Sequence, residues 1–174
     1  MGRVASAAVH VGIVAIPEAG LATLSGIFDV LNSLAWLDGH EGLPAGPTFQ
    51  VELLGEAADP VPLASGVTLP LHGAAPGRSC DIVIVPSLFV RGTGWKGGRY
   101  PDLARWIVER HRAGATICSA CSGLFLIAET GLFDGVDATV HWPYARMFGA
   151  QYPAVRVHPD RALVVSGQRG ELIS

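Results

Sequence analysis

Two apolar runs rich in valine and isoleucine, over residues 7–16 and 81–86, stand out along the chain, and a proline closes each of them. Few polar residues interrupt these runs, which is typical of strands buried on both faces of a parallel sheet. A third run over 115–120 leads directly to Cys121. The pattern therefore predicts that all three runs are central strands.

Apolar residues recur at helical spacing over 20–38, which predicts a first helix with Thr23 or Ser25 as its cap. A second helix is expected to begin at Pro101, because proline suits the first helical position. Asp102 would then lie beside the positive end of that helix. The apolar stripe of this helix comprises Leu103, Trp106 and Ile107.

The remaining predicted elements are shorter. A helix over 124–130 is expected to end at Gly131, because glycine readily adopts the left-handed conformation that ends helices. Four more strands are predicted over 49–55, 138–142, 155–157 and 162–166, and the segment over 61–71 is expected to be a short hairpin or an excursion. Strands that alternate with helices predict an α/β fold with a mainly parallel central sheet.

Length and charge narrow the possible functions. The 174 residues suit one domain, and 12 Lys and Arg against 15 Asp and Glu give a formal net charge of -3. Because no run of basic residues is present, we do not expect this chain alone to bind DNA. No apolar run approaches the roughly 18 residues of a membrane span, so no membrane association is expected.

Three cysteines are too few for a disulfide framework, and we expect a cytoplasmic protein. The histidines other than His141 are scattered without ligand spacing, so neither a metal site nor another cofactor is expected. Residues 92–97 match G-x-G-x-x-G, but the loop is long and no acid follows at the spacing that dinucleotide binding needs. We interpret the segment over 87–100 as a mobile flap.

The candidate chemistry gathers at the carboxyl ends of the predicted strands, where α/β proteins bind ligands. The strongest signal is Cys121, since a nucleophile on a sharp turn between strand and helix is lifted into the crevice. A buried structural cysteine remains the alternative. Cys118 and Cys121 also spell C-x-x-C, but Cys118 lies within a predicted strand, so a redox pair is disfavoured.

Two residues could assist Cys121. His141 could orient the thiol across the crevice, or its ring could be satisfied locally. Glu18 follows the first strand, where its carboxyl group could stay protonated and tune the thiol, or simply face water. The same edge supplies the candidate ligand-binding residues, which are Ser87, Leu88, Ser122, Gly123 and Trp142.

Residues 99–142 contain several motifs that are typical of a known protein family. They include Cys121-Ser122-Gly123, Ala128-Glu129-Thr130-Gly131-Leu132 and Val140-His141-Trp142. The chain resembles the PfpI-type class I glutamine amidotransferase-like superfamily and, more narrowly, the amino-terminal domain of AraC-type transcriptional regulators. The resemblance implies a flavodoxin-like three-layer sandwich, commonly a homodimer. It also implies a pocket that Cys121 shares with a carboxylate from the first helix region. We call the sharp turn between strand and helix at Cys121 the elbow.

One departure from that pattern bears on function. Relatives of the isocyanide hydratase type carry the carboxylate of the shared pocket six residues before a Glu or Asp of the first helix. In this chain the Glu or Asp of the first helix is Asp29, so the position of the pocket carboxylate is Thr23. We therefore expect residues 1–174 to be one domain that senses a small-molecule effector and dimerises. It would lack the carboxyl-terminal helix of its relatives and would contact DNA only through a helix-turn-helix domain outside this chain. The alternative is a small enzyme of the isocyanide hydratase, amidase or glyoxalase type that uses Cys121, with Glu18 as the missing acid.

Overall fold

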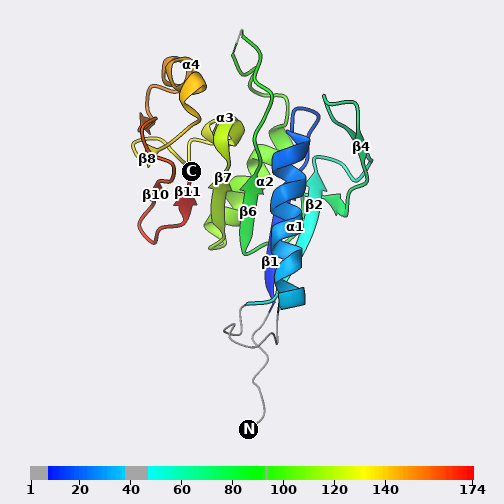
Figure 1. Cartoon of the computed structure of the whole chain (residues 1–174). Coiled ribbons are helices and arrows are strands. Elements are labelled where there is room, and N and C mark those ends of the chain that lie inside the picture. The colour runs from blue at the N-terminus through cyan, green and yellow to red at the C-terminus, as the bar shows by residue number, and fades with distance from the viewer. Residues whose placement is uncertain (1–7, 38–46, 93) are drawn as a thin grey trace.

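The computed structural model describes residues 8–37, 47–92 and 94–174, and its centre is a seven-stranded sheet (Figure 1). The order of the strands across the sheet is β10-β11-β7-β6-β1-β2-β5. Their bounds are β1 (Val9–Val14), β2 (Phe49–Gly55), β5 (Gly73–Ala74), β6 (Ile82–Val85), β7 (Thr116–Ser119), β10 (Val165–Ser166) and β11 (Leu172–Ile173). Among the described strands of this sheet, β10 alone runs antiparallel to its neighbour. The mainly parallel sheet predicted from the sequence is confirmed.

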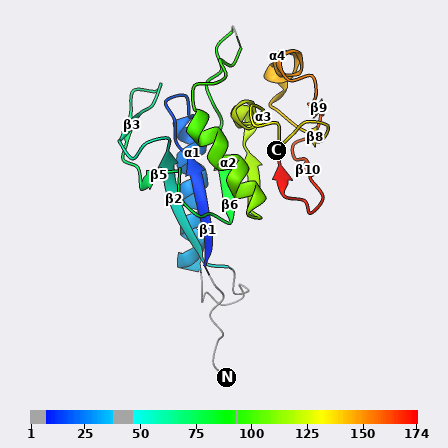
Figure 2. The ribbon, with the colours of Figure 1, turned by 180° about the vertical axis from the view of Figure 1, so that it is seen from behind.

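Helices cover both faces of the sheet. Helix α1 (Leu21–Leu37) lies on one face, and α2 (Pro101–Arg112) and α3 (Leu124–Ala128) lie on the other (Figures 1 and 2). This arrangement confirms the three-layer α/β sandwich. None of the helices in the described ranges has the length and apolar content that crossing a membrane requires.

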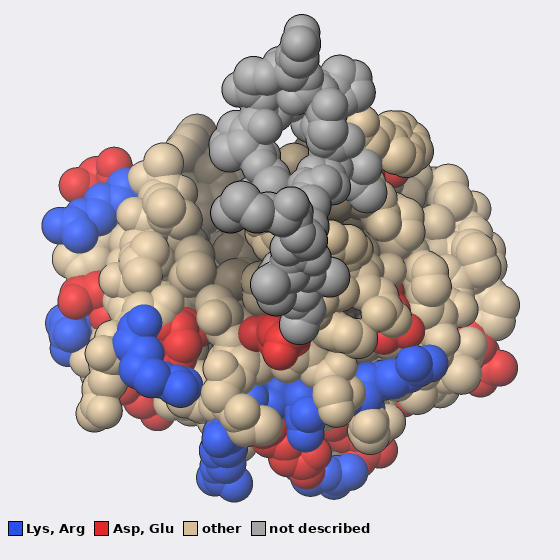
Figure 3. Space-filling view, turned by 90° about the horizontal axis from the view of Figure 1, so that it is seen from below, with Lys and Arg blue, Asp and Glu red and all other residues tan. Residues whose placement is uncertain are grey.

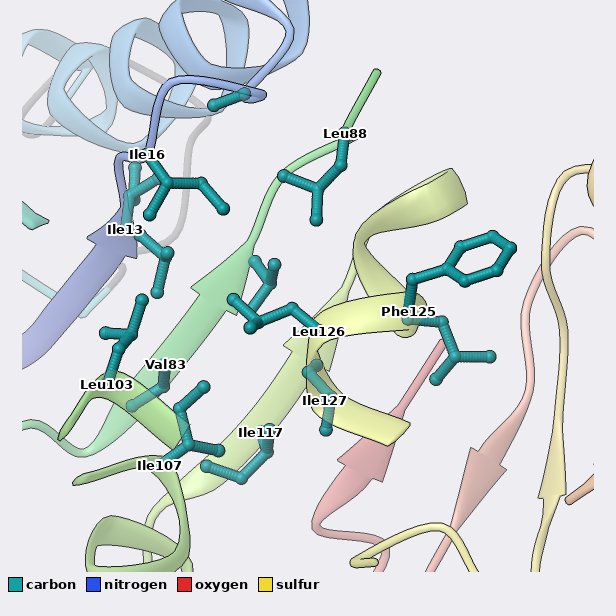
Figure 4. Packing of buried hydrophobic residues seen from close by; sticks show 14 of the residues in the cluster. Ile13, Ile16, Val83, Leu88, Leu103, Ile107, Ile117, Phe125, Leu126 and Ile127 are labelled. Carbon is teal, nitrogen blue, oxygen red and sulfur yellow. The ribbon is translucent and has the colours of Figure 1, made fainter. Parts of the chain in front are cut away.

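The core between the sheet and α2 and α3 follows from the alternation of side chains along the strands. Val83 of β6 and Ile117 of β7 are register partners, so their side chains share one face, and both are fully buried. Ile107 of α2 and Leu126 and Ile127 of α3 pack over them (Figure 4). The short helix α3 is therefore fixed by apolar packing at its centre.

Helix α2 matches its prediction closely. Pro101 occupies its first turn, and Leu103, Trp106 and Ile107 form its buried stripe. The indole N–H of Trp106 donates a hydrogen bond to the carbonyl of Arg78 at 2.9 Å. This bond satisfies the only polar atom of a large buried side chain.

The predicted cap of α1 is wrong. The helix begins at Leu21, so Thr23 and Ser25 lie inside its first turns. The start of α1 is instead fixed by the backbone, because the N–H of Gly20 donates to the carbonyl of Ser87 at 2.7 Å. The hydroxyl of Thr23 is hydrogen-bonded to the hydroxyl of Ser87 at 2.6 Å, which ties the helix to the segment after β6.

The last third of the chain differs most from the predictions. The strands predicted over 138–142 and 162–166 are reduced to β8 (Asp137–Ala138) and β10, and β9 (Arg156–Val157) pairs with β8 in a separate small sheet. His141 and Trp142 do not end a strand. They enter a 3-10 turn, η2 (Trp142–Tyr144), because Pro143 cannot donate a ladder hydrogen bond. Helix α4 (Ala145–Gln151) and strands β5 and β11 were not predicted.

Two other short elements agree with the sequence. The hairpin predicted over 61–71 is present as β3 (Val61–Pro62) and β4 (Thr68–Leu69), which pair with each other in antiparallel fashion. Helix α3 is two residues shorter than predicted, and Gly131 follows it with a φ of 74°. The glycine thus adopts the left-handed conformation expected at a helix end.

The segment over 87–100 is not the free flap expected from the sequence, because other elements hold its described second half. The indole N–H of Trp95 and the backbone N–H of Gly98 donate hydrogen bonds to Glu129, which follows α3. Gln151, at the end of α4, donates to the carbonyl of Trp95 at 2.7 Å and accepts from its backbone N–H. Thr93 lies outside the described residues. Charged and amide side chains thus anchor this part of the segment.

The contact between Gly123 and β6 yields a stability prediction. A Cβ atom at Gly123 would lie 2.3 Å from the carbonyl oxygen of Val85 and 2.6 Å from that of Pro86, both backbone atoms. We expect Gly123→Ala to lower the free energy of unfolding by about 3 kcal/mol or more. Gly149→Ala is the control, since its Cβ would meet open space within α4 and should stabilise by up to about 1 kcal/mol. Urea unfolding measures both, and equal stabilities would contradict the assigned packing.

Candidate functional site

Cys121 occupies the sharp turn that the sequence predicted. It follows β7 after one residue and begins a 3-10 turn, η1 (Cys121–Gly123), that leads into α3. Its φ of 57° is the only positive value among the described residues other than glycine. A left-handed backbone costs a residue with a Cβ about 1–2 kcal/mol, so the surrounding contacts must hold this turn. The side chain is exposed.

Ser122 and Gly123 supply the contacts that hold the turn. The buried hydroxyl of Ser122 donates to the carbonyl of Leu88 at 2.6 Å and accepts from the N–H of Leu88 at 2.8 Å. Gly123 packs directly on the backbone carbonyls at the end of β6. Both residues belong to the turn, and in this structure their contacts with Leu88 and the end of β6 fix its position.

Cys121, His141 and Trp142 line one cavity of about 670 Å³, and we refer to it as the Cys121 cavity. Three of the candidate residues predicted from the sequence thus lie around one space. The thiol of Cys121 and the ring of His141, both in the described part of the chain, form no hydrogen bond with each other. The His141 ring instead packs edge-to-face on Trp142, with ring centroids 5.9 Å apart.

One wall of the Cys121 cavity was not predicted from the sequence. Asp160, Arg161 and Leu163 line it, together with Thr139 and Ser174. Backbone hydrogen bonds between Val164 and Ser174 hold this wall, and the N–H of Thr139 donates to the hydroxyl of Ser174 at 2.8 Å. No local motif marks these residues, because a pairing between distant parts of the chain assembles them.

Ser87 and Leu88, two other candidate ligand-binding residues, do not line the Cys121 cavity. The Ser87 hydroxyl is bonded to Thr23, and its carbonyl accepts from Gly20. Leu88 is buried, and Ser122 occupies both of its backbone polar groups. These described residues therefore join the elbow to the start of α1.

Glu18 also lies outside the lining of the Cys121 cavity in the described part of the chain. The hydroxyl of Tyr100 donates to its carboxylate at 2.6 Å, and Arg99 forms an ion pair with the same group. Burial opposes ionisation of Glu18, but the hydrogen bonds from Tyr100 and Arg99 outweigh it and lower the pKa of the carboxyl group. Glu18 is therefore a charged, paired carboxylate in this structure.

The other two cysteines have less reactive surroundings. Burial raises the pKa of the Cys118 thiol to about 11. Burial, followed by the charge of Glu52, raises the pKa of the Cys80 thiol to about 11 as well. Both thiols are free, and the side chain of Cys118 lies within β7 rather than at the turn. The C-x-x-C pair is thus divided between a half-buried strand position and an exposed turn.

No family model matches the chain, but curated relatives and solved structures do. The HTH-type transcriptional regulator CdhR of Pseudomonas aeruginosa is 29% identical over 110 residues, which are 63% of this chain and 32% of that protein. Isonitrile hydratase of Pseudomonas putida is 28% identical over 140 residues, or 79% of this chain and 54% of that protein. The chain thus spans between about a third and about half of the length of these relatives.

Several solved structures are similar to this chain, and each of the following three covers 95% of it. A protein from Vibrio parahaemolyticus described as a transcriptional regulator has a TM-score of 0.78, with 18% identity and 82% of its own chain covered. Drosophila melanogaster DJ-1beta has a TM-score of 0.73, with 15% identity and 80% covered. The chain has the DJ-1/ThiJ/PfpI fold. An AraC family transcriptional regulator from Pseudomonas putida has the same fold, with a TM-score of 0.72, 18% identity and 82% of its chain covered.

Proteins similar to this chain thus include regulators and one protein named as an enzyme, and the structure agrees with the resemblance inferred from the sequence. The relatives at 28–29% identity include one protein of each kind. The choice between the two functions depends on the side chains around Cys121, because one fold can host many activities.

The exposure of the three cysteines yields a prediction about reactivity. Because the thiolate is the nucleophile, the raised pKa values of Cys80 and Cys118 keep both thiols protonated at pH 8. We expect brief treatment with limiting iodoacetamide to label Cys121 first, as mapped by mass spectrometry. Raising the pH towards 11 should narrow the difference between Cys121 and the other two. Preferential labelling of Cys80 or Cys118 at pH 8 would show that Cys121 is not the accessible thiol.

Proposed function

We propose that this chain is the ligand-sensing and dimerisation domain of an AraC-type transcriptional regulator and that it has no catalytic activity. The observation that carries this proposal is the state of Thr23. The resemblance implies that enzymes of the isocyanide hydratase type carry an acid at this position, whereas here it is a threonine whose hydroxyl is bonded to Ser87. A hydroxyl cannot replace a carboxylate as partner of an activated thiol at neutral pH. Glu18, the substitute considered from the sequence, is committed to Arg99 and Tyr100.

The Cys121 cavity suits a small-molecule effector. Its volume of about 670 Å³ lies within the usual range of roughly 300–1,000 Å³ for ligand pockets. Trp142 and Leu163 offer exposed apolar surface at 72% and 63%, and Val140 adds a buried apolar wall. Arg161 supplies a charged group among these apolar side chains. This composition supports binding of an organic molecule with at least one polar group.

A cysteine-dependent enzyme is the second candidate, and one observation favours it. The exposed Cys121 shares its cavity with His141 and with the carboxylate of Asp160, so a nucleophile, a base and an acid line the same space. The similarity to isonitrile hydratase supports this alternative. Asp160 rather than Glu18 is then the acid to test.

Contact with DNA, in this proposal, requires a helix-turn-helix domain outside the chain. The similarity to CdhR supports this assignment. Positive and negative side chains alternate on the described surface seen from below, with no broad basic area on that face (Figure 3). Together with the net charge of -3, this distribution supports binding of DNA only through another domain. The proposal also places the protein in the cytoplasm, where such regulators act.

Dimerisation would involve the outer surface of α1. This 17-residue helix contains one charged residue, Asp29, while Val30 and Trp36 are 61% and 78% exposed. Exposed apolar side chains concentrated on one helix support association with a second copy, and two-fold dimers are the commonest form. Paired sensing domains would also present paired reading domains to two half-sites on DNA.

The absence of catalysis can be tested together with effector binding. We expect no turnover of isocyanides, glyoxals or small amides above the level of Cys121→Ala. An effector found by thermal-shift screening should slow alkylation of Cys121 and should lose affinity in Trp142→Ala but not in the control Val67→Ala, because Val67 is exposed and lines neither the Cys121 cavity nor the outer face of α1. If the parent shows turnover that Cys121→Ala abolishes, the proposal fails. Asp160→Asn and Glu18→Gln would then identify the acid, because loss of the partner costs orders of magnitude in rate.

Association can be measured by light scattering after size exclusion at low micromolar concentration. We expect a mass near twice the 18.2 kDa of the chain. Val30→Glu, which places a charge on the exposed face of α1, should produce the monomer. Val67→Glu is the matched control, because Val67 is also exposed, at 41%, but lies outside α1. A parent protein that runs as an 18.2 kDa monomer would contradict the dimer.

A further inference from the structure

A second concave region lies at the segment after β6, and it shares no lining residue with the Cys121 cavity. It consists of two adjoining cavities of about 440 and 230 Å³. Glu18, Phe89 and Arg91 line both of them, and we call the combined space the Phe89 hollow. Together the two cavities have the size of a small-molecule site.

The charges of the Phe89 hollow are unbalanced. Arg99 and Glu18 neutralise each other in an ion pair, and the Arg99 guanidinium lies 4.5 Å from the ring centroid of Trp95, which holds it in place. Arg91 and Lys96 also line the hollow, and no described residue forms an ion pair with either side chain. The hollow therefore carries two surplus positive charges on a chain whose net charge is -3.

Apolar surface accompanies this charge. Phe89 is 54% exposed, which is unusual for a residue whose side chain gains about 2 kcal/mol on burial. Its backbone is nevertheless fixed, because the N–H of Phe89 donates to the carbonyl of Glu18 at 2.8 Å. Across the hollow, the N–H of Ala64 donates to the carbonyl of Pro17 at 2.7 Å. The rim is thus preorganised, which lowers the entropic cost of binding.

We propose that the Phe89 hollow binds a small carboxylate with an apolar body. Arg91 would hold the carboxylate, because a guanidinium matches its two oxygens in a bidentate pair. Lys96 adds a second positive charge, and Phe89 contacts the apolar body of the ligand. The paired Glu18 does not repel the anion, since Arg99 and Tyr100 already occupy its oxygens.

The test uses 3-phenylpropionate as the probe and the tryptophan indole signals in a ¹⁵N NMR spectrum as the readout. Trp95 lines the Phe89 hollow, whereas Trp142 lines the Cys121 cavity. We expect 3-phenylpropionate to shift the Trp95 signal saturably and to leave the Trp142 signal in place. The matched amine, 3-phenylpropylamine, and acetate should each bind at least about tenfold more weakly, because each lacks one of the two recognised features.

Two variants and a control assign the contacts. Arg91→Gln should weaken binding of 3-phenylpropionate by about tenfold or more, since it removes a charge-assisted hydrogen bond. Phe89→Ala should weaken it several-fold through loss of apolar contact. Arg112→Gln is the control, because Arg112 is also exposed but lies at the far end of α2. The signal of the buried Trp106 reports whether each variant is folded.

Three outcomes would overturn the proposal. In the first, 3-phenylpropylamine binds as tightly as 3-phenylpropionate. In the second, Arg91→Gln binds 3-phenylpropionate as tightly as the parent does. In the third, 3-phenylpropionate shifts only the indole signal of Trp142. The last would place the probe in the Cys121 cavity instead. The first two outcomes do not bear on effector sensing at Cys121, because the two spaces have no lining residue in common.

Discussion

The left-handed backbone of Cys121 is an unfavourable conformation that its neighbours hold in place. These neighbours lie at the carboxyl ends of the parallel strands, which we call the carboxyl edge. Gly123 allows the start of α3 to lie against the carbonyls of Val85 and Pro86, where any larger residue would collide. Ser122 then bonds both backbone polar groups of Leu88. These contacts are all short and directional, so the turn has little freedom to relax.

The position of Leu88 in turn organises the next part of the edge. Leu88 pairs with Ala19 in an isolated antiparallel bridge, and Ser87 contacts both Gly20 and Thr23 at the start of α1. The segment after β6 is thus held from both sides, by the elbow and by the first helix. As a result the edge is divided into two spaces, the Cys121 cavity and the Phe89 hollow. A single crevice, as the sequence suggested, would have let Glu18 approach the thiol.

The sequence predicted best those elements whose identity depends on residues close together in the chain. Strands β1, β6 and β7 are continuous apolar runs, α2 has a complete apolar stripe after Pro101, and the elbow at Cys121 has its own local motif. Each of these can be inferred within about ten residues, because periodicity and turn chemistry act locally.

The remaining features depend on contacts between distant segments. Glu18 and Arg99 are 81 positions apart, and Thr139 and Ser174 are 35 apart, so no local pattern indicates either pair. The two-residue strands β8, β9, β10 and β11 are too short to show a period. Their positions are set by pairing partners, which is why the wall of the Cys121 cavity that contains Asp160 and Arg161 was missed.

The strained turn at Cys121 has a structural role besides any catalytic one. In an enzyme a strained turn is retained because it exposes a nucleophile. Here the same turn also anchors Leu88, and through it the start of α1, so its loss would disturb packing far from the thiol. A chain with a threonine rather than an acid at position 23 still needs Ser122 and Gly123 to hold Leu88 and the start of α1 in place. The strained turn is therefore consistent with a binding domain as well as an enzyme, and the partners of Cys121 distinguish the two more sharply than its backbone does.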